Sequence, residues 1–191
     1  MLKVIRQLIN QQYQINKNAK ECHLCSLRDG AKQVVPGDGN PKARLMLIGE
    51  GPGKEEDEQG RPFVGAAGQL LDNILKASKI TREEVYIANV VKCRPPRNRN
   101  PQQEEINTCK PWLDLQIAAV SPDLIVCLGL TASRAVLGVN DSLHNLRGKW
   151  HNFGEIKVLC TYHPAALLRS PRLKIPTWED FQMVMKEYGT A

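Results

Sequence analysis

Short apolar runs alternate with helical patterns along most of the chain. The apolar runs predict strands at residues 45–48, 85–91, 123–129 and 155–161. Helices are predicted around them at 2–15, 68–79, 101–120, 131–137 and 178–188. The first helix is predicted from apolar residues at helical spacing, Val4, Ile5, Leu8 and Ile9. Because strands and helices alternate, the expected fold class is α/β, a three-layer αβα sandwich around a central, mostly parallel four-stranded sheet. We expect residues 1–191 to form one domain.

The first predicted strand runs directly into a glycine-rich turn. Gly49, Gly51 and Gly53 fall within five residues, and Pro52 separates the last two. Such a turn cannot continue a strand, and it lets the backbone approach a ligand closely. The acidic run 55–58 and the segment 60–63, which ends in Phe63, follow it. This order favours a pocket at the carboxyl edge of a sheet, with an ordinary strand–turn–helix connection and solvated acids as the alternative.

Two other predicted strands also end in unusual segments. Asn89 lies near the end of the second strand, and His163-Pro164 follows the fourth. The carboxyl ends of parallel strands meet at one edge of a sheet, where ligands bind. Together with the glycine turn, these segments predict one site at that edge.

Composition narrows the class of protein and of partner. The chain has 191 residues, 24% of them charged and 42% hydrophobic, as is ordinary for a globular protein. It contains no apolar run as long as a membrane span and no signal-peptide core at its N-terminus, so we expect a cytoplasmic protein without a membrane partner. A net charge of +6 indicates a polyanionic partner, with nucleic acid as the first candidate.

The six cysteines fall into two groups. Cys127 and Cys160 lie inside apolar runs and are expected to be buried core thiols. The other four lie among polar, charged or proline-rich residues: Cys22, Cys25, Cys93 and Cys109. Four thiolates suit either tetrahedral zinc or an iron–sulfur cluster, and unrelated thiols are the alternative. A zinc ribbon usually has a second Cys-x-x-Cys pair, and the wide split between the last two cysteines favours the cluster.

Taken in order, these segments resemble the family 4 uracil-DNA glycosylases, the iron–sulfur branch of that superfamily. The resemblance covers the chain from about Cys22 to Arg172. Four segments carry it: Gly-Glu-Gly-Pro-Gly at 49–53, Gly-Arg-Pro-Phe-Val-Gly at 60–65, Ala-Asn-Val-Val-Lys-Cys-Arg-Pro-Pro at 88–96, and His-Pro-Ala-Ala-Leu-Leu-Arg at 163–169.

The resemblance implies an enzyme of base excision repair. It would flip deoxyuridine out of DNA, hydrolyse the N-glycosidic bond, release uracil and leave an abasic site. Uracil-containing DNA, single- or double-stranded, would be its substrate, and it would act as a monomer near the nucleoid. The resemblance also implies that a structural 4Fe–4S cluster is ligated by Cys22, Cys25, Cys93 and Cys109, in an N-terminal cluster-binding segment of the single domain.

The resemblance assigns the base pocket to three side chains. Phe63 would stack on the flipped base, although it could be a core residue. Asn89 would read the O4/N3 edge of uracil, which cytosine reverses, although it could bond its own backbone. His163 would donate a hydrogen bond to uracil O2 as the base departs, although a structural histidine beside proline is the alternative.

Further residues are assigned by their place in the motifs. Glu56 would lie against C5 of the base and exclude the thymine methyl, or be one of several solvated acids. Leu167 would be the wedge that fills the gap left in DNA. Two basic strips would contact phosphates, or be plain solvated surface. The strips are Arg169, Arg172 and Lys174, and Arg94, Arg97 and Arg99.

One position departs from the superfamily pattern. Where the best-known branch has an aspartate that orients the attacking water, this chain has Gly51. Glu50 is expected to hold the water or to brace the turn, and Glu50, Gly51 and Pro52 to contact the substrate. Two other classes stay open: a non-hydrolysing or covalently trapping uracil-DNA binding protein, and an iron–sulfur electron carrier or polymerase accessory module.

Overall fold

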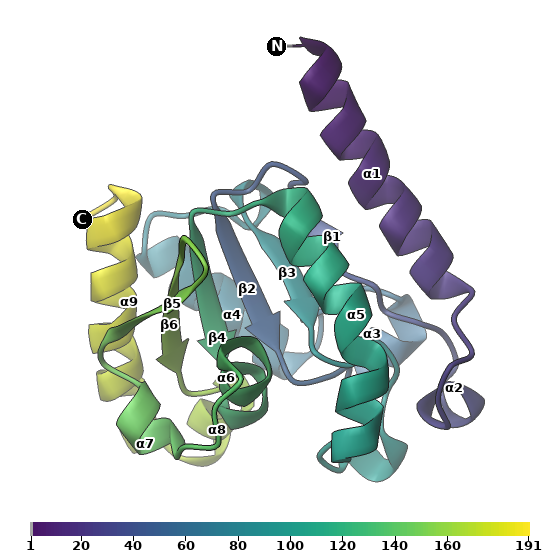
Figure 1. The fold of residues 1–191 in the computed structure, drawn as a ribbon. Helices are drawn as coiled ribbons and strands as arrows, with labels where there is room; N and C mark the ends of the chain where they lie inside the picture. Colours follow the sequence, from purple (N-terminus) through teal and green to yellow (C-terminus); the bar gives the residue numbers. More distant parts are fainter. Residues whose placement is uncertain (1) are drawn as a thin grey trace.

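The computed structural model describes residues 2–191, with side chains described from Asn10 onward. Within these residues one sheet has the strand order β1-β3-β2-β4-β6-β5 (Figure 1). The strands are β1 (Asp38–Gly39), β2 (Leu45–Gly49), β3 (Tyr86–Asn89), β4 (Leu124–Leu128), β5 (Trp150–Phe153) and β6 (Ile156–Thr161). Strands β3, β2, β4 and β6 are parallel, and β1 and β5 are antiparallel edge strands.

The predicted sheet was right in its mostly parallel character and wrong in its strand number, which is six and not four. The four predicted strands are the four parallel ones. Both missed strands lie at an edge and carry no apolar run: β1 is an Asp-Gly dipeptide, and β5 is a partly exposed Trp-His-Asn-Phe segment. Edge strands lack the two-sided burial that makes a strand conspicuous in sequence.

Nine α-helices occupy the described part of the chain. They are α1 (Leu2–Lys20), α2 (Leu27–Gly30), α3 (Lys54–Gln59), α4 (Ala66–Ala77), α5 (Gln103–Val120), α6 (Leu130–Leu137), α7 (Leu143–Leu146), α8 (Pro164–Arg169) and α9 (Lys174–Tyr188). The five predicted helices correspond to α1, α4, α5, α6 and α9 with shifted ends. The apolar face predicted at Val4, Ile5, Leu8 and Ile9 lies outside the described side chains. None of the helices described is long and apolar enough to cross a membrane.

Helices cover both faces of the sheet, which confirms the three layers. Met46 and Ile48 point to the face that α5 and α6 cover, together with Leu113 of α5. Leu45 and Leu47 point to the other face, which α4 and α9 cover. Figure 1 shows α5 and α6 in front of the sheet and α4 behind it, with α1 alongside α5. Alternate side chains of each strand are therefore buried on opposite faces.

The predicted core thiols are confirmed as buried. Cys127 of β4 and Cys160 of β6 are register partners, and both are fully buried. They are part of the core on the α5 side of the sheet.

The chain order creates a crevice at the centre of the sheet. From β2 the chain moves to β3 on one side and then to β4 on the other side of β2. In open α/β sheets such a reversal leaves a crevice beyond the carboxyl ends of the strands. Each of the four parallel strands ends at this edge. Gly49 is the last residue of β2 and Asn89 the last of β3, Gly129 follows β4, and His163 lies two residues after β6.

Candidate active site

A cleft of about 1170 Å³ lies at the carboxyl edge of the parallel strands. The predicted pocket residues line it together: Glu50, Gly51, Pro52, Glu56, Phe63, Asn89 and His163. They come from four separate segments of the chain. The structure therefore brings the predicted pocket residues together at this edge of the sheet.

Asn89 lies at the bottom of the pocket with one polar atom unused. Its side chain is 1% exposed, and its Oδ1 finds no hydrogen-bond partner among the described residues. Gly49 keeps the space beside it open, since an added Cβ would lie 2.4 Å from Asn89 Oδ1 and 2.7 Å from Phe63 Cζ. A buried carbonyl without a partner is costly unless a ligand donates to it.

Phe63 faces the same space in an unusual backbone conformation. Its φ is 52°, in the left-handed region, and it is 5% exposed. Its ring centroid lies 5.5 Å from that of His163, with 32° between the planes. Gly68 of α4 admits the Phe63 carbonyl, because an added Cβ would lie 2.0 Å from that oxygen. Phe63 is therefore placed at the pocket wall, while its carbonyl packs into the start of α4.

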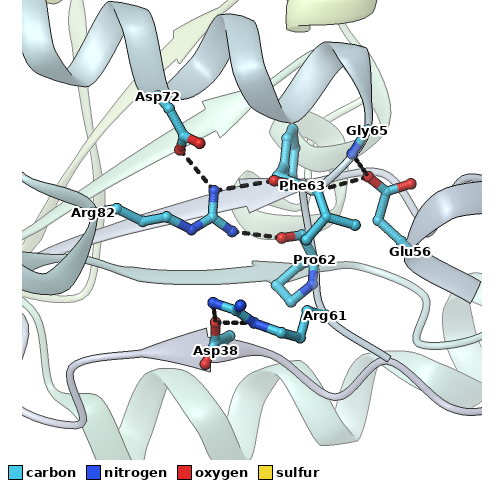
Figure 2. A network of polar contacts seen from close by, with 9 residues as sticks. Asp38, Glu56, Arg61, Pro62, Phe63, Gly65, Asp72 and Arg82 are labelled. Atoms are coloured by element: carbon cyan, nitrogen blue, oxygen red, sulfur yellow. Dashed lines mark hydrogen bonds and ion pairs between the residues drawn. The ribbon is translucent and has the colours of Figure 1, made fainter. Parts of the chain in front are cut away.

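Two charged side chains hold the loop that carries Phe63 (Figure 2). Glu56 of α3 accepts hydrogen bonds from the backbone N–H groups of Gly53 (3.0 Å), Val64 (2.8 Å) and Gly65 (2.9 Å). The carboxylate is 8% exposed, so the solvated-acid alternative is wrong for Glu56. On the other side of the loop, Arg82 donates to the carbonyls of Pro62 and Phe63.

Glu50 contacts a residue that sequence reasoning missed. The hydroxyl of Thr131, in the first turn of α6, donates to Glu50 Oε2 at 2.5 Å. Both residues line the cleft. Thr131 could have been found from its position, because it follows the carboxyl end of a predicted strand as the other site segments do. Gly51 has no room for a side chain, since a Cβ there would lie 2.7 Å from Cγ2 of Val91.

The surroundings of His163 determine the charge of its ring and the nitrogen that carries the proton. Its Nδ1 accepts a hydrogen bond from the backbone N–H of Ala165 at 3.1 Å. Burial, together with the nearby positive charge of Arg169, lowers the pKa of His163 to about 4. The ring is therefore neutral at physiological pH, and its single proton is on Nε2. A neutral imidazole of this kind can donate one hydrogen bond into the cleft.

The two basic strips divide by position. Arg169 of α8 and Arg99 line the cleft. Arg99 also pairs with the carboxylate of Glu105 at 2.6 Å. The other four basic residues lie outside the residues that line it: Arg94, Arg97, Arg172 and Lys174. Arg94 donates to Asn98 Oδ1 at 2.7 Å, and the rest are exposed. The cleft also includes Lys54, Lys110 and Arg134, which the sequence-based prediction did not name.

The structure corrects the predicted wedge. Leu167 is 2% exposed, and a side chain buried in the protein cannot enter DNA. Its neighbour Leu168 is 49% exposed and lines the cleft. The motif alone could not distinguish the two leucines, because they are adjacent and only the start of α8 decides which one faces outward.

The four cysteines in polar contexts come together. Cys22, Cys25, Cys93 and Cys109 line one small cavity between the end of α1, the segment after β3 and α5. Burial, with smaller contributions from the other three thiols, raises the pKa of Cys93 to about 12. The indole N–H of Trp112 donates to Cys22 Sγ at 3.4 Å. Among the described side chains, from Asn10 onward, no three His, Cys, Asp or Glu residues are grouped so as to hold a single metal ion.

Comparison with known proteins defines the class to which this fold and cleft belong. The model of the uracil DNA glycosylase superfamily matches residues 36–182. The chain is 48% identical over 160 residues to a type-4 uracil-DNA glycosylase of Thermotoga maritima, covering 82% of each chain. It is 44% identical over 179 residues to one of Sulfurisphaera tokodaii, covering 89% of this chain and 81% of the relative.

A third relative, the type-4 uracil-DNA glycosylase of Archaeoglobus fulgidus, is 40% identical over 178 residues, or 89% of each chain. The chain therefore belongs to the type-4 uracil-DNA glycosylases of that superfamily. The resemblance drawn from the motifs is confirmed.

Proposed function

We propose that this protein hydrolyses the N-glycosidic bond of deoxyuridine in DNA, releases uracil and leaves an abasic site for base excision repair. Its family membership supports the reaction class. The observation that carries the substrate assignment is the buried Asn89 Oδ1 without a partner at the bottom of the cleft. A base can reach such a position only after it has left the stack.

Asn89 selects the base through its amide. Its Oδ1 accepts from the N3–H of uracil, and its NH₂ group donates to O4. Cytosine has an acceptor at N3 and a donor at N4, so both contacts would be reversed. A site built around a buried polar group rejects the wrong pattern because that group is then left unpaired.

Phe63 and Glu56 shape the two sides of the base. The Phe63 ring supplies a stacking surface, a contact worth about 1–3 kcal/mol per base. Glu56 lies at the wall of the cleft, and its role in excluding the methyl group of thymine stays a prediction. Since its carboxylate is bound to backbone N–H groups, it also gives the wall a fixed position.

His163 stabilises the departing base. As the glycosidic bond breaks, negative charge develops on uracil O2, and the Nε2–H of the neutral imidazole donates to that oxygen. A donor already aimed at the developing charge contributes about 3 kcal/mol to catalysis. The Ala165 N–H keeps the imidazole in the tautomer that this step requires.

Glu50 orients the attacking water, with Thr131 holding its carboxylate. Gly51 and Pro52 complete the turn that faces the sugar. Leu168 replaces Leu167 as the proposed wedge, because it is exposed at the rim of the cleft. Arg169 and Arg99 are the phosphate contacts best placed along the cleft, and Arg94 and Arg172 stay predictions at its periphery.

The four grouped cysteines are proposed to hold a 4Fe–4S cluster. They fit this cofactor because four thiols from three segments face one cavity, and four thiolates are its usual ligand set. In hydrolysis the cluster would supply no redox step. It would tie the segment after α1 to the loop between β3 and α5, which begins directly after Asn89. The single domain and the monomeric state stay predictions.

Strand scission at the abasic site tests the proposed function. A labelled oligonucleotide with one uracil is incubated with the protein and then treated with alkali. We expect cleaved product from the wild type and a loss of at least about 100-fold in His163→Ala and Asn89→Ala, with His144→Ala and Asn152→Ala as exposed controls at wild-type rate. Binding to uracil-DNA without alkali-labile product would instead favour the non-hydrolysing or covalently trapping class.

A further inference from the structure

Two side chains of opposite charge hold one backbone group from each of the four consecutive residues 62–65 in the Phe63 loop. Arg82 Nη2 donates to the carbonyl of Pro62 at 2.6 Å, and its Nη1 donates to the carbonyl of Phe63 at 3.0 Å. Glu56 Oε1 accepts from the next two N–H groups, those of Val64 and Gly65. Figure 2 shows Arg82 and Glu56 on opposite sides of this loop.

Arg82 is itself fixed by a third element. Its Nη1 lies 2.7 Å from Asp72 Oδ1, and Asp72 belongs to α4. Arg82 begins the short 3-10 helix Arg82–Glu84, which leads into β3 and so toward Asn89. The Arg82 side chain is 20% exposed, so its bonds to the two carbonyls are partly shielded from water. The guanidinium therefore joins α4, the approach to β3 and the Phe63 loop.

The backbone conformation of Phe63 indicates what the bonds from Arg82 and Glu56 do. A left-handed φ of 52° is unfavourable for a residue with a side chain, and it persists where the surroundings determine it. Gly60 of the same loop also has a left-handed φ, 71°, which causes no strain because glycine has no side chain. The strain falls instead on the residue whose ring lines the cleft beside His163.

We propose that Arg82, fixed by Asp72, is a positioning residue of the active site. It holds the Pro62 and Phe63 carbonyls so that the Phe63 ring stands ready against the flipped base. A planar guanidinium with several donors can bridge two carbonyls and a carboxylate, which a lysine ammonium does less well. The inference rests on the proposed function, because stacking by Phe63 is part of that proposal.

A double-mutant cycle with Arg82→Met and Phe63→Ala tests the inference. The readout is the inhibition constant of free uracil, measured in the excision assay, because it reports the base pocket. We expect Arg82→Met to weaken uracil inhibition about tenfold, and Arg82→Lys to give a smaller loss. In the Phe63→Ala background, Arg82→Met should add less than about twofold, since a residue that acts through Phe63 has nothing left to position.

Controls separate positioning from general stability. Arg61 is the matched control: it precedes Pro62 and pairs with Asp38 at 2.8 Å, so Arg61→Met removes a cation and an ion pair from the same loop. We expect it to leave uracil inhibition within about twofold of wild type. Two quantities are measured for every variant: its affinity for DNA that contains no uracil, and its melting temperature. Arg82→Lys supplies the readout if Arg82→Met does not fold.

The outcomes distinguish this inference from the proposed function. If Phe63→Ala weakens uracil inhibition and the Arg82 variants do not, Arg82 is not a positioning residue. If the Arg82 and Phe63 losses are additive, Arg82 acts by a route other than the ring, and the inference is overturned. If Phe63→Ala itself has no effect, the stacking role in the proposed function fails first.

Discussion

The carboxylate of Glu50 and the hydroxyl of Thr131 meet across the centre of the sheet. Glu50 follows β2, and Thr131 lies in the first turn of α6, directly beyond β4. Strands β2 and β4 are neighbours, and the chain reverses its direction of progress between them. The contact therefore spans the crevice in which open α/β sheets bind their ligands, and it fixes a carboxylate at the proposed site of reaction.

Removing the Thr131 hydroxyl should slow excision without greatly changing the fold. A hydrogen bond to a charged group is worth about 1.5–3 kcal/mol, so Thr131→Val should reduce the single-turnover rate by roughly 10- to 100-fold. Thr131→Ser keeps the hydroxyl and is the control, with a rate close to wild type. Equal rates for the Val and Ser variants would show that Glu50 needs no partner.

A methyl group at Gly49 should block the base pocket. Its Cβ would lie 2.4 Å from Asn89 Oδ1 and 2.7 Å from Phe63 Cζ, between the amide proposed to read the base and the ring proposed to stack on it. Displacement of either group by a fraction of an ångström should reduce excision by about 100-fold or more in Gly49→Ala. Gly30→Ala is the matched control, because no described atom lies within 4 Å of its added Cβ. A wild-type rate for Gly49→Ala would contradict the pocket assignment.

The low pKa of His163 has consequences for stability as well as for chemistry. Because the folded protein lowers this pKa from 6.5 to about 4, the unfolded chain binds the proton more readily between these values. Stability associated with neutral His163 is present above about pH 6.5 and is lost as pH falls toward 4. Urea unfolding from pH 7 to 4.5 should therefore show a steeper loss for wild type than for His163→Ala. Parallel losses would contradict this assignment.

Activity should follow the same titration. Since His163 donates as the neutral imidazole, the single-turnover rate should show no decline attributable to His163 from pH 8 down to about pH 5. A rate that rises as pH falls through 6.5 would indicate a protonated donor instead.

Substitutions of Leu168 and Leu167 should have different effects, the first on activity and the second on stability. Leu168→Ala should slow excision from duplex DNA more than from single-stranded DNA, because a single strand leaves no stacked gap to fill. Leu167→Ala should instead destabilise the protein by about 2–5 kcal/mol, as expected for a buried leucine. Ile175→Ala, an exposed apolar residue of α9, is the control for surface changes. Equal losses on both DNA forms for Leu168→Ala would remove it as the wedge.

The cysteines divide into two sets that iron analysis can separate. Serine at Cys22, Cys25, Cys93 or Cys109 should lower bound iron and the visible cluster absorption, because each change would remove one of the proposed thiolate ligands. Cys127→Ser and Cys160→Ser are matched controls, since these thiols are buried in the core away from that cavity. They should keep the iron. Zinc in place of iron in anaerobically purified wild type would contradict the cluster.

Much of this architecture could be predicted from the sequence, and the failures have physical causes. The four parallel strands are conspicuous because both faces are buried, whereas β1 and β5 lie at edges and lack that signal. Helix α3 was missed because Lys-Glu-Glu-Asp-Glu-Gln has no apolar stripe. Its position depends on Glu56, whose carboxylate reaches back to the N–H of Gly53 and forward to the Phe63 loop.

The site divides in the same way. Asn89, Phe63 and His163 could be named because each stands in a distinctive local segment. Arg82 could not, because an arginine after a helix is ordinary in sequence, and only its position after a predicted strand marks Thr131. Their contacts with Glu50 and with the Phe63 carbonyl join residues 81 and 19 positions apart. The choice between Leu167 and Leu168 likewise depends on packing that no local pattern records.

The inhibition of excision by free uracil, compared with inhibition by 3-methyluracil, tests most directly whether Asn89 reads the base. If Asn89 Oδ1 accepts from the N3–H of the base, uracil should inhibit the wild type, and 3-methyluracil, which lacks that hydrogen, should inhibit at least about tenfold more weakly. In Asn89→Ala the difference between the two bases should largely disappear. Equal inhibition of the wild type by both compounds would contradict the account, because the buried carbonyl would then not be reading the base.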